Sequence, residues 1–199
     1  MKIKKSVYLC YLLFLICSCS EVPGKLLIME ANSLNARGMY NEAISSYLKA
    51  LGYAEAEPFG EFGLGSVFFA LGEEQAALDR FERAMHILET NPSAAGGREL
   101  RYRIHYNTGV VLFSAGDFSG AADSFRAALR ADGSRVEAKR NLELSLRSLA
   151  RDTQSTGGDR GDIEHESRAA FFEFVRQREL NQWRLRIWPE EEEVSGPDY

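Results

Sequence analysis

Small and hydrophobic residues recur at fixed spacings three times between residues 24 and 135. Each copy surrounds a glycine, at Gly38, Gly72 and Gly116, and the first two glycines are 34 residues apart. A small residue lies seven positions before each glycine, a large apolar residue four before it, an aromatic residue nine after it and an alanine twelve after it. Spacings of three and four residues predict an amphipathic helix on each side of the glycine, which itself permits the left-handed turn that ends a helix. The chain is therefore predicted to contain three helix pairs.

The small residue is Ala31, Gly65 or Gly109 in the three copies, and only a small side chain there lets the two helices of a pair approach closely. This pattern resembles the tetratricopeptide repeat (TPR) family, whose repeat is a helix pair of 34 residues. Gly72 and Gly116 are 44 residues apart, which indicates ten inserted residues between the second and third repeats. The resemblance implies an all-α solenoid of three repeats, at about 24–57, 58–91 and 102–135.

Four further segments follow the repeats. Residues 136–150 have leucines at spacings of four and three, which predicts a helix that caps the open end of the solenoid and completes a TPR domain over 24–150. Residues 151–163 are polar and rich in glycine, which indicates a flexible linker. Residues 164–188 are predicted to form an amphipathic helix with many aromatic side chains, and residues 189–199 an acidic tail. We expect the C-terminal helix either to dock on the array, in its groove or beside the cap, or to be presented to a partner.

Residues 1–18 have the composition of a secretory signal peptide. Three lysines are followed by an apolar run over residues 7–17, which is too short to span a bilayer. The last four residues up to Cys19 resemble the lipobox of bacterial lipoproteins, with an aliphatic residue first and a small serine before the cysteine. The resemblance implies cleavage before Cys19, acylation of that cysteine and a short tether over residues 19–23. A plain signal peptide and an uncleaved membrane anchor are the alternatives.

Composition and charge narrow the classes of function. Hydrophobic residues make up 45% of the chain and charged residues 27%, as in an ordinary globular protein. The net charge of −5 gives no electrostatic basis for binding nucleic acid. All three cysteines lie in the N-terminal segment, and His86, His105 and His165 lack the spacing of a metal site. No nucleophile motif or phosphate loop is recognisable, so we expect no enzyme activity, metal or cofactor.

The residues that line the groove of a TPR array can be assigned from the register, because the first helix of each repeat faces that groove. The resemblance implies a partner-binding groove formed by Asn32, Phe59, Phe62, Phe69, Arg103, Tyr106, Val110, Phe113 and Arg140. TPR domains that bind chaperone tails use a carboxylate clamp, with which Asn32 and Asn107 are compatible. Ile28 and Gly63 are not, so the expected ligand is an amphipathic helix or an extended apolar peptide. The alternative interpretation is that some of the aromatic residues pack within the repeats.

Five short stretches indicate a narrower resemblance. YNTG (106–109), AALRA (127–131), AKRNLELSL (138–146), RQRELNQW (176–183) and GPDY (196–199) resemble the TPR proteins of Bat aerotolerance-type operons. That resemblance implies an envelope scaffold with a role in stress tolerance and a partner that contains a von Willebrand factor A domain.

The predicted function is a lipid-anchored adaptor on the cell membrane or the outer membrane. It would face the periplasm and bind a segment of an envelope protein in its groove. Two alternatives remain: a carrier of an apolar small molecule or a transporter accessory subunit, and an accessory factor for an enzyme of envelope assembly.

Overall fold

The computed structural model describes residues 22–90 and 96–154, which form seven α-helices and no strand. The helices are α2 (Val22–Ala36), α3 (Tyr40–Ala50), α4 (Glu57–Ala70), α5 (Glu74–Thr90), α6 (Gly97–Ser114), α7 (Phe118–Ala131) and α8 (Val136–Gln154). The predicted signal peptide, Cys19, the C-terminal helix at 164–188 and the acidic tail lie outside the described residues. The prediction of an all-α helix-pair array is confirmed.

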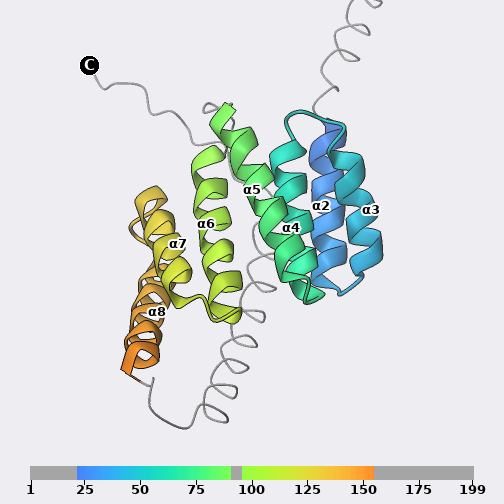
Figure 1. Ribbon diagram of the computed structural model, residues 1–199. Coiled ribbons are helices and arrows are strands. Elements are labelled where there is room, and N and C mark those ends of the chain that lie inside the picture. The colour runs from blue at the N-terminus through green and yellow to red at the C-terminus, as the bar shows by residue number, and fades with distance from the viewer. Residues whose placement is uncertain (1–21, 91–95, 155–199) are drawn as a thin grey trace, which may run out of the picture.

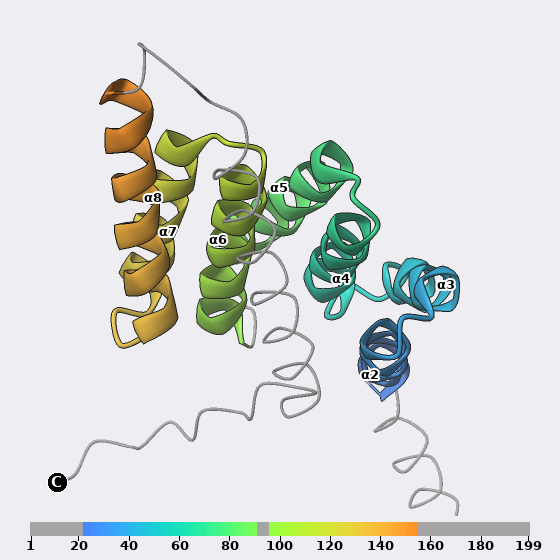
Figure 2. The same ribbon diagram turned by 90° about the horizontal axis from the view of Figure 1, so that it is seen from below.

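The helices form three pairs that stand side by side, from α2 and α3 at one end of the array to α8 at the other (Figure 1). The first helix of each pair also contacts the first helix of the next pair, α2 with α4 and α4 with α6. Helices α2, α4 and α6 run along one side of the row, and α3, α5 and α7 run along the other (Figure 2). We call the side of α2, α4 and α6 that is turned away from their partners the inner face, and the opposite side of the array the outer face.

The turn within each pair has the same backbone conformation. Gly38, Gly72 and Gly116 have φ values of 74°, 81° and 84°, in the left-handed region that favours glycine. In the first turn the N–H of Gly38 donates to the carbonyl of Asn35 at 2.9 Å, and the next N–H, that of Met39, donates to the carbonyl of Leu34 at 3.0 Å. The same two bonds recur in the other two turns, and together they form a Schellman motif. The predicted left-handed turns are confirmed.

The small residue seven positions before each turn lies where the two helices of a pair approach most closely. A Cβ atom on Gly65 would lie 2.5 Å from Cε1 of Phe81, and one on Gly109 would lie 2.8 Å from Cε1 of Phe125. Both distances are shorter than real Cβ contacts, so these positions need glycine in the observed packing. Ala31, the equivalent residue of the first pair, is fully buried.

Buried aromatic rings hold the pairs together. Tyr47, Phe81 and Phe125 occupy equivalent positions on α3, α5 and α7, and none is more than 1% exposed. Each fully buried ring of this size stabilises the fold by about 1.5–3 kcal/mol. The core also crosses between pairs, because the Phe81 cluster includes Leu100 and Ile104 of α6. The array is therefore a continuous stack rather than three separate hairpins.

Three helix boundaries differ from those expected. Helix α2 begins at Val22, two residues before the predicted start of the first repeat. Helix α6 begins at Gly97, five residues before the predicted start of the third repeat, and the left-handed Gly96 (φ 70°) precedes it. Helix α8 continues to Gln154, four residues into the segment expected to be a linker. The apolar side of α8 packs against the core of the third pair through Leu142, Leu144 and Leu149, which confirms the predicted capping helix.

Candidate functional site

The nine residues predicted to line the groove lie on the first helix of each pair and on α8. Asn32 is on α2, Phe59, Phe62 and Phe69 are on α4, Arg103, Tyr106, Val110 and Phe113 are on α6, and Arg140 is on α8. Because α4 contacts both α2 and α6, the first eight of these residues lie on three helices that are neighbours in the array. Arg140 lies on the cap, beyond the third pair.

Three of these residues belong to the hydrophobic core. Phe62, Val110 and Phe113 are 3%, 1% and 4% exposed. The ring centre of Phe62 lies 5.6 Å from that of Phe81, and the ring centre of Phe113 lies 5.1 Å from that of Phe118. The side chains of these three residues therefore stabilise the array through core packing.

The other predicted residues are more accessible, with one exception. Phe59, Phe69, Arg103 and Tyr106 are half-buried, and Arg140 is exposed. Asn32 is the exception at 5% exposed. The half-buried aromatic side chains are the part of the predicted groove that combines apolar character with surface.

Asn32 has a structural contact that the sequence pattern did not reveal. Its Oδ1 accepts a hydrogen bond of 2.6 Å from the hydroxyl of Tyr47, which ties α2 to α3. Burial raises the pKa of Tyr47, so the hydroxyl keeps its proton and remains a donor. The two residues that do not suit a carboxylate clamp also have packing roles: Ile28 lies in the core of the first pair, and Gly63 lies against the ring of Tyr47.

Among the described residues, no cluster of His, Cys, Asp and Glu is suited to hold a metal ion. His105 on α6 is half-buried, and its pKa is lowered by burial and by the nearby charges of Arg130 and Arg101. The imidazole is therefore neutral over a wider range of pH than an exposed histidine. This environment is that of a histidine packed among its neighbours on α6.

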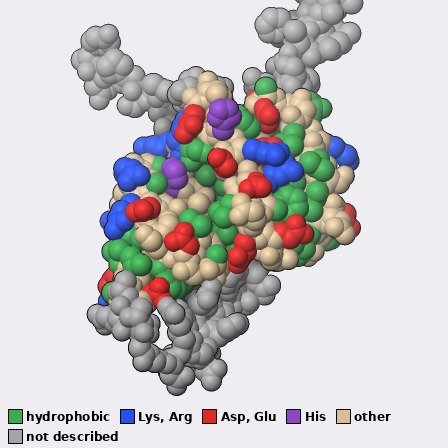
Figure 3. Space-filling view, viewed as in Figure 1, with side chains coloured by type: hydrophobic (Ala, Val, Ile, Leu, Met, Phe, Trp, Pro, Cys, Tyr) green, Lys and Arg blue, Asp and Glu red, His purple; other side chains and the backbone are tan. Residues whose placement is uncertain are grey.

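The outer face is mixed in character. Figure 3, which views the array as Figure 1 does, shows acidic and basic side chains interspersed with hydrophobic ones over this side of the molecule. Such a surface has no field of one sign to attract a polyanion. No helix within 22–90 or 96–154 is both long enough and apolar enough to cross a membrane.

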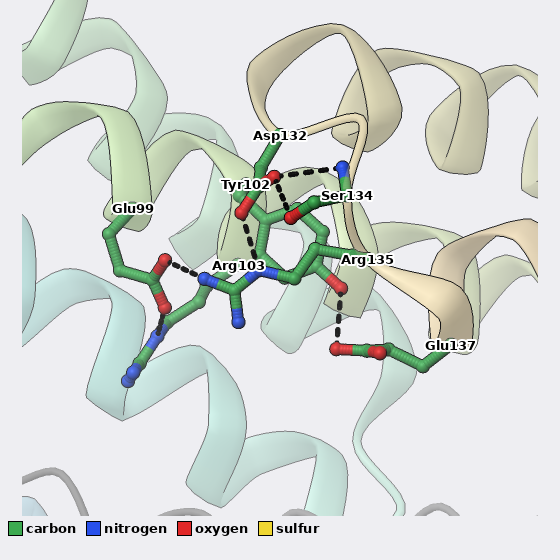
Figure 4. Close-up of polar contacts among 7 residues, drawn as sticks. All are labelled: Glu99, Tyr102, Arg103, Asp132, Ser134, Arg135 and Glu137. Atoms are coloured by element: carbon green, nitrogen blue, oxygen red, sulfur yellow. Dashed lines mark hydrogen bonds and ion pairs between the residues drawn. The ribbon is translucent and has the colours of Figure 1, made fainter.

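A polar network joins α6 to the turn before α8 (Figure 4). Arg135 forms an ion pair with Asp132 at 2.5 Å and another with Glu99 of α6. Its guanidinium lies 4.7 Å from the ring centre of Tyr102, and Glu99 pairs in addition with Arg103 at 2.8 Å. Arg103, a predicted groove residue, is therefore held in position by the same network that holds the cap.

Asp132 shapes the turn itself. Its Oδ1 accepts hydrogen bonds from the backbone N–H and the hydroxyl of Ser134, at 3.0 and 2.6 Å. The hydrogen bond from the Ser134 hydroxyl and that from Arg135 hold the pKa of Asp132 well below its ordinary value. On the other side of the turn, the Tyr102 hydroxyl donates to Glu137 at 3.3 Å. Burial and the nearby charge of Glu137 raise the pKa of Tyr102.

Tyr106 provides a second link between α6 and the cap. Its hydroxyl accepts a hydrogen bond of 3.0 Å from Nδ2 of Asn141 on α8, and its ring centre lies 5.6 Å from that of Phe125. Sequence reasoning missed these links to the cap. The Asp-x-Ser sequence at residues 132–134 is a local signal for the turn before α8, and it could have indicated the Asp132 contacts.

Comparison with known proteins agrees with this geometry. Residues 93–136 match the family model described as Tetratricopeptide repeat. A tetratricopeptide repeat and J domain-containing co-chaperone of Cryptococcus neoformans is 30% identical over 107 residues, which is 52% of this chain but only 18% of that protein. The chain therefore spans less than a fifth of the length of this curated relative.

Solved structures show the same fold. The Sgt2 TPR domain from Aspergillus fumigatus has a TM-score of 0.57 and 23% sequence identity, and the match covers 70% of this chain and 87% of that chain. The first TPR domain of Spaghetti (RPAP3), solved with the HSP90 peptide SRMEEVD, has a TM-score of 0.54 and 19% identity, and the match covers 64% and 94%. The described part of this chain therefore has the TPR fold, with three helix pairs and a cap, and its third pair matches the tetratricopeptide repeat family.

Proposed function

We propose that this chain is a membrane-anchored adaptor of the bacterial cell envelope, and that its inner face binds an apolar or helical segment of a partner protein. The observation that supports the proposal most strongly is the row of half-buried aromatic and arginine side chains, Phe59, Phe69, Arg103 and Tyr106, on adjacent helices of a TPR array. Aromatic and arginine side chains are enriched where protein interfaces gain most of their binding energy.

The character of this face favours an apolar segment over a free C-terminal carboxylate. Ile28 is buried in the core and Gly63 offers no side chain, so the positions that would donate hydrogen bonds to a carboxylate are apolar or empty of functional groups. An amphipathic helix that places apolar side chains every three to four residues suits such a surface. We therefore propose a ligand chemistry different from the HSP90 peptide bound by the RPAP3 domain.

The anchor and the partner class come from the sequence resemblances. Acylated Cys19 would hold the array beside the membrane, because the described fold begins at Val22, three residues later. The partner proposed from the narrower resemblance is an envelope protein with a von Willebrand factor A domain.

Fractionation of cells tests the anchor. The wild-type protein is expected in the membrane fraction, and Cys19→Ser is expected to release it. Retention of Cys19→Ser on the membrane would contradict the lipoprotein proposal.

Purification from solubilised membranes tests the binding face. We expect a reproducible partner, identified by mass spectrometry, that is lost in Phe59→Ala and Phe69→Ala and kept in Leu48→Ala, whose side chain is 49% exposed on α3. Equal capture by the inner-face and Leu48 variants would contradict the proposed face. Native mass spectrometry that finds a bound lipid or other apolar molecule would instead support a carrier.

A further inference from the structure

The inner face carries half-buried aromatic side chains on adjacent helices. Phe59 and Phe69 lie on α4 and Tyr106 lies on α6. The second helices of the pairs lie on the opposite side, and no helix of the described ranges crosses the inner face (Figure 2).

The chain beyond α8 contains a segment with the chemistry to pack on such a face. Residues 164–188 include the apolar residues Phe171, Phe172, Phe174, Val175, Leu180, Trp183, Leu185 and Trp188. Removing so much aromatic surface from water stabilises a protein, whereas a large exposed apolar patch is an interaction site or a liability. The segment also contains both tryptophans of the chain.

The connection after α8 is long enough for residues 164–188 to reach the inner face. The connection from Gln154 to residue 164 has about nine residues, which span up to about 30 Å when extended. As a helix, residues 164–188 would be about 37 Å long at 1.5 Å per residue. Packed helices lie about 8–10 Å apart, so α2, α4 and α6 together span about 20–30 Å, which a helix of this length can cross.

We propose that residues 164–188 bind the inner face of their own array and must be displaced before a partner segment can bind. This proposal rests on the proposed function of the inner face as a protein-binding surface. The aromatic side chains of the segment contact Phe59, Phe69 and Tyr106, the same residues that a partner would use.

The short connection makes even a weak contact effective. A segment tethered by a short flexible linker has an effective concentration on the order of 1 mM. A contact with an intrinsic dissociation constant of about 100 µM would then be occupied about 90% of the time. A partner present at micromolar concentration must compete with the tethered segment, so its apparent affinity falls about tenfold.

Tryptophan fluorescence of the full chain tests the proposal, because Trp183 and Trp188 report on the segment alone. We expect blue-shifted emission that acrylamide quenches poorly in the wild-type protein. Phe59→Ala and Phe69→Ala are expected to shift the emission towards that of the urea-denatured protein. Leu48→Ala, on the outer side of α3, is expected to leave it unchanged.

A second variant keeps the test valid if the inner-face variants lose stability. Phe172→Asp changes the segment and leaves the array intact, so the helical circular dichroism signal of α2–α8 should be kept while the tryptophan emission shifts to the red.

Wild-type emission equal to that of the denatured protein, or emission that neither set of variants shifts, would overturn the proposal. A shift that depends on protein concentration between about 1 and 100 µM would also overturn it, since the occupied face would then belong to a second copy. None of these results bears on partner capture from membranes, which tests the proposed function separately.

Discussion

The close approach of α4 and α5 makes a specific prediction for Gly65→Ala. The new Cβ would lie 2.5 and 2.6 Å from two ring carbons of Phe81 and 3.1 Å from the carbonyl oxygen of Ala77, whereas favourable contacts lie at about 3.5–4 Å. Phe81 is 1% exposed, so its ring cannot swing into solvent, and the carbonyl belongs to the backbone of α5. The helices must therefore separate by roughly 1 Å.

The two opposing free-energy contributions can be compared. Overpacking of a dense core costs about 1–3 kcal/mol, and replacing glycine by alanine inside a helix returns about 1 kcal/mol. Because the new Cβ meets a backbone carbonyl as well as a buried ring, we expect a cost of about 2–3 kcal/mol. Gly65→Ala should therefore lower the free energy of unfolding by about 1–2 kcal/mol. At about 4 °C per kcal/mol for a domain of this size, the melting temperature should fall by about 4–8 °C.

Urea denaturation followed by far-ultraviolet circular dichroism measures the effect, and a double-mutant cycle assigns its cause. Phe81→Leu removes the ring that blocks the new methyl group, so Gly65→Ala should cost at least about 1 kcal/mol less in that background than in the wild type. Ala31→Gly is the matched control, because the first pair already has an alanine at this position, and it should destabilise the protein by losing a buried methyl group. If Gly65→Ala is as stable as the wild type, or if the two substitutions are additive, the steric explanation is wrong.

The remaining predictions concern the polar contacts. Arg135→Ala removes two ion pairs and the contact of the guanidinium with the Tyr102 ring, and it should lower the free energy of unfolding by about 1–2 kcal/mol. Arg147→Ala, the control, breaks only an exposed ion pair and should cost less than about 0.5 kcal/mol. Equal costs of the two substitutions in urea denaturation would contradict this prediction. Tyr47→Phe leaves the buried Oδ1 of Asn32 without its donor and should cost about 1–2 kcal/mol, and a neutral result would mean that this bond has no net effect. The pKa of Asp132 in the folded protein lies below its ordinary value of 3.8. The ionised Asp132 carboxylate therefore stabilises the fold fully above pH 3.8, and this stabilisation is lost as the pH falls through the pKa of the folded state. The difference in stability between the wild type and Asp132→Asn should therefore shrink only below about pH 4, and a difference that shrinks at higher pH would refute the assignment.

The repeat could be predicted from the sequence because its signals are local and periodic. A turn glycine, a small residue seven positions earlier and an aromatic residue nine positions later specify the helix pair wherever they occur together, and Gly38, Ala31 and Tyr47 show this in the first pair. The start of α6 was less predictable, because the insertion before it interrupts the period. The extension of α8 to Gln154 was missed since Arg151 and Asp152 are exposed on the helix and have no apolar pattern.

Several polar contacts between helices depend on pairs of residues that are distant in sequence. Arg135 and Glu99 are 36 residues apart, and neither has a flanking pattern that indicates the other. Glu61 is only 6% exposed, and its carboxylate pairs with Arg80, 19 residues later, at 2.9 Å. The register places residues on a face, but it does not tell which of them are buried in the core behind that face, as Phe62 is.

Site-specific photo-crosslinking from position 69 tests the central claim most directly. A photoreactive phenylalanine analogue replaces Phe69 in the full chain, and one that replaces Leu48 on α3 serves as the control. The account predicts crosslinks from position 69 into residues 164–188 in the purified protein, and into an apolar segment of one identified envelope protein in native membranes. Position 48 should give neither product. Crosslinks from position 69 that reach neither the C-terminal segment nor a membrane partner, or that match those from position 48, would contradict the claim that the inner face is a protein-binding surface.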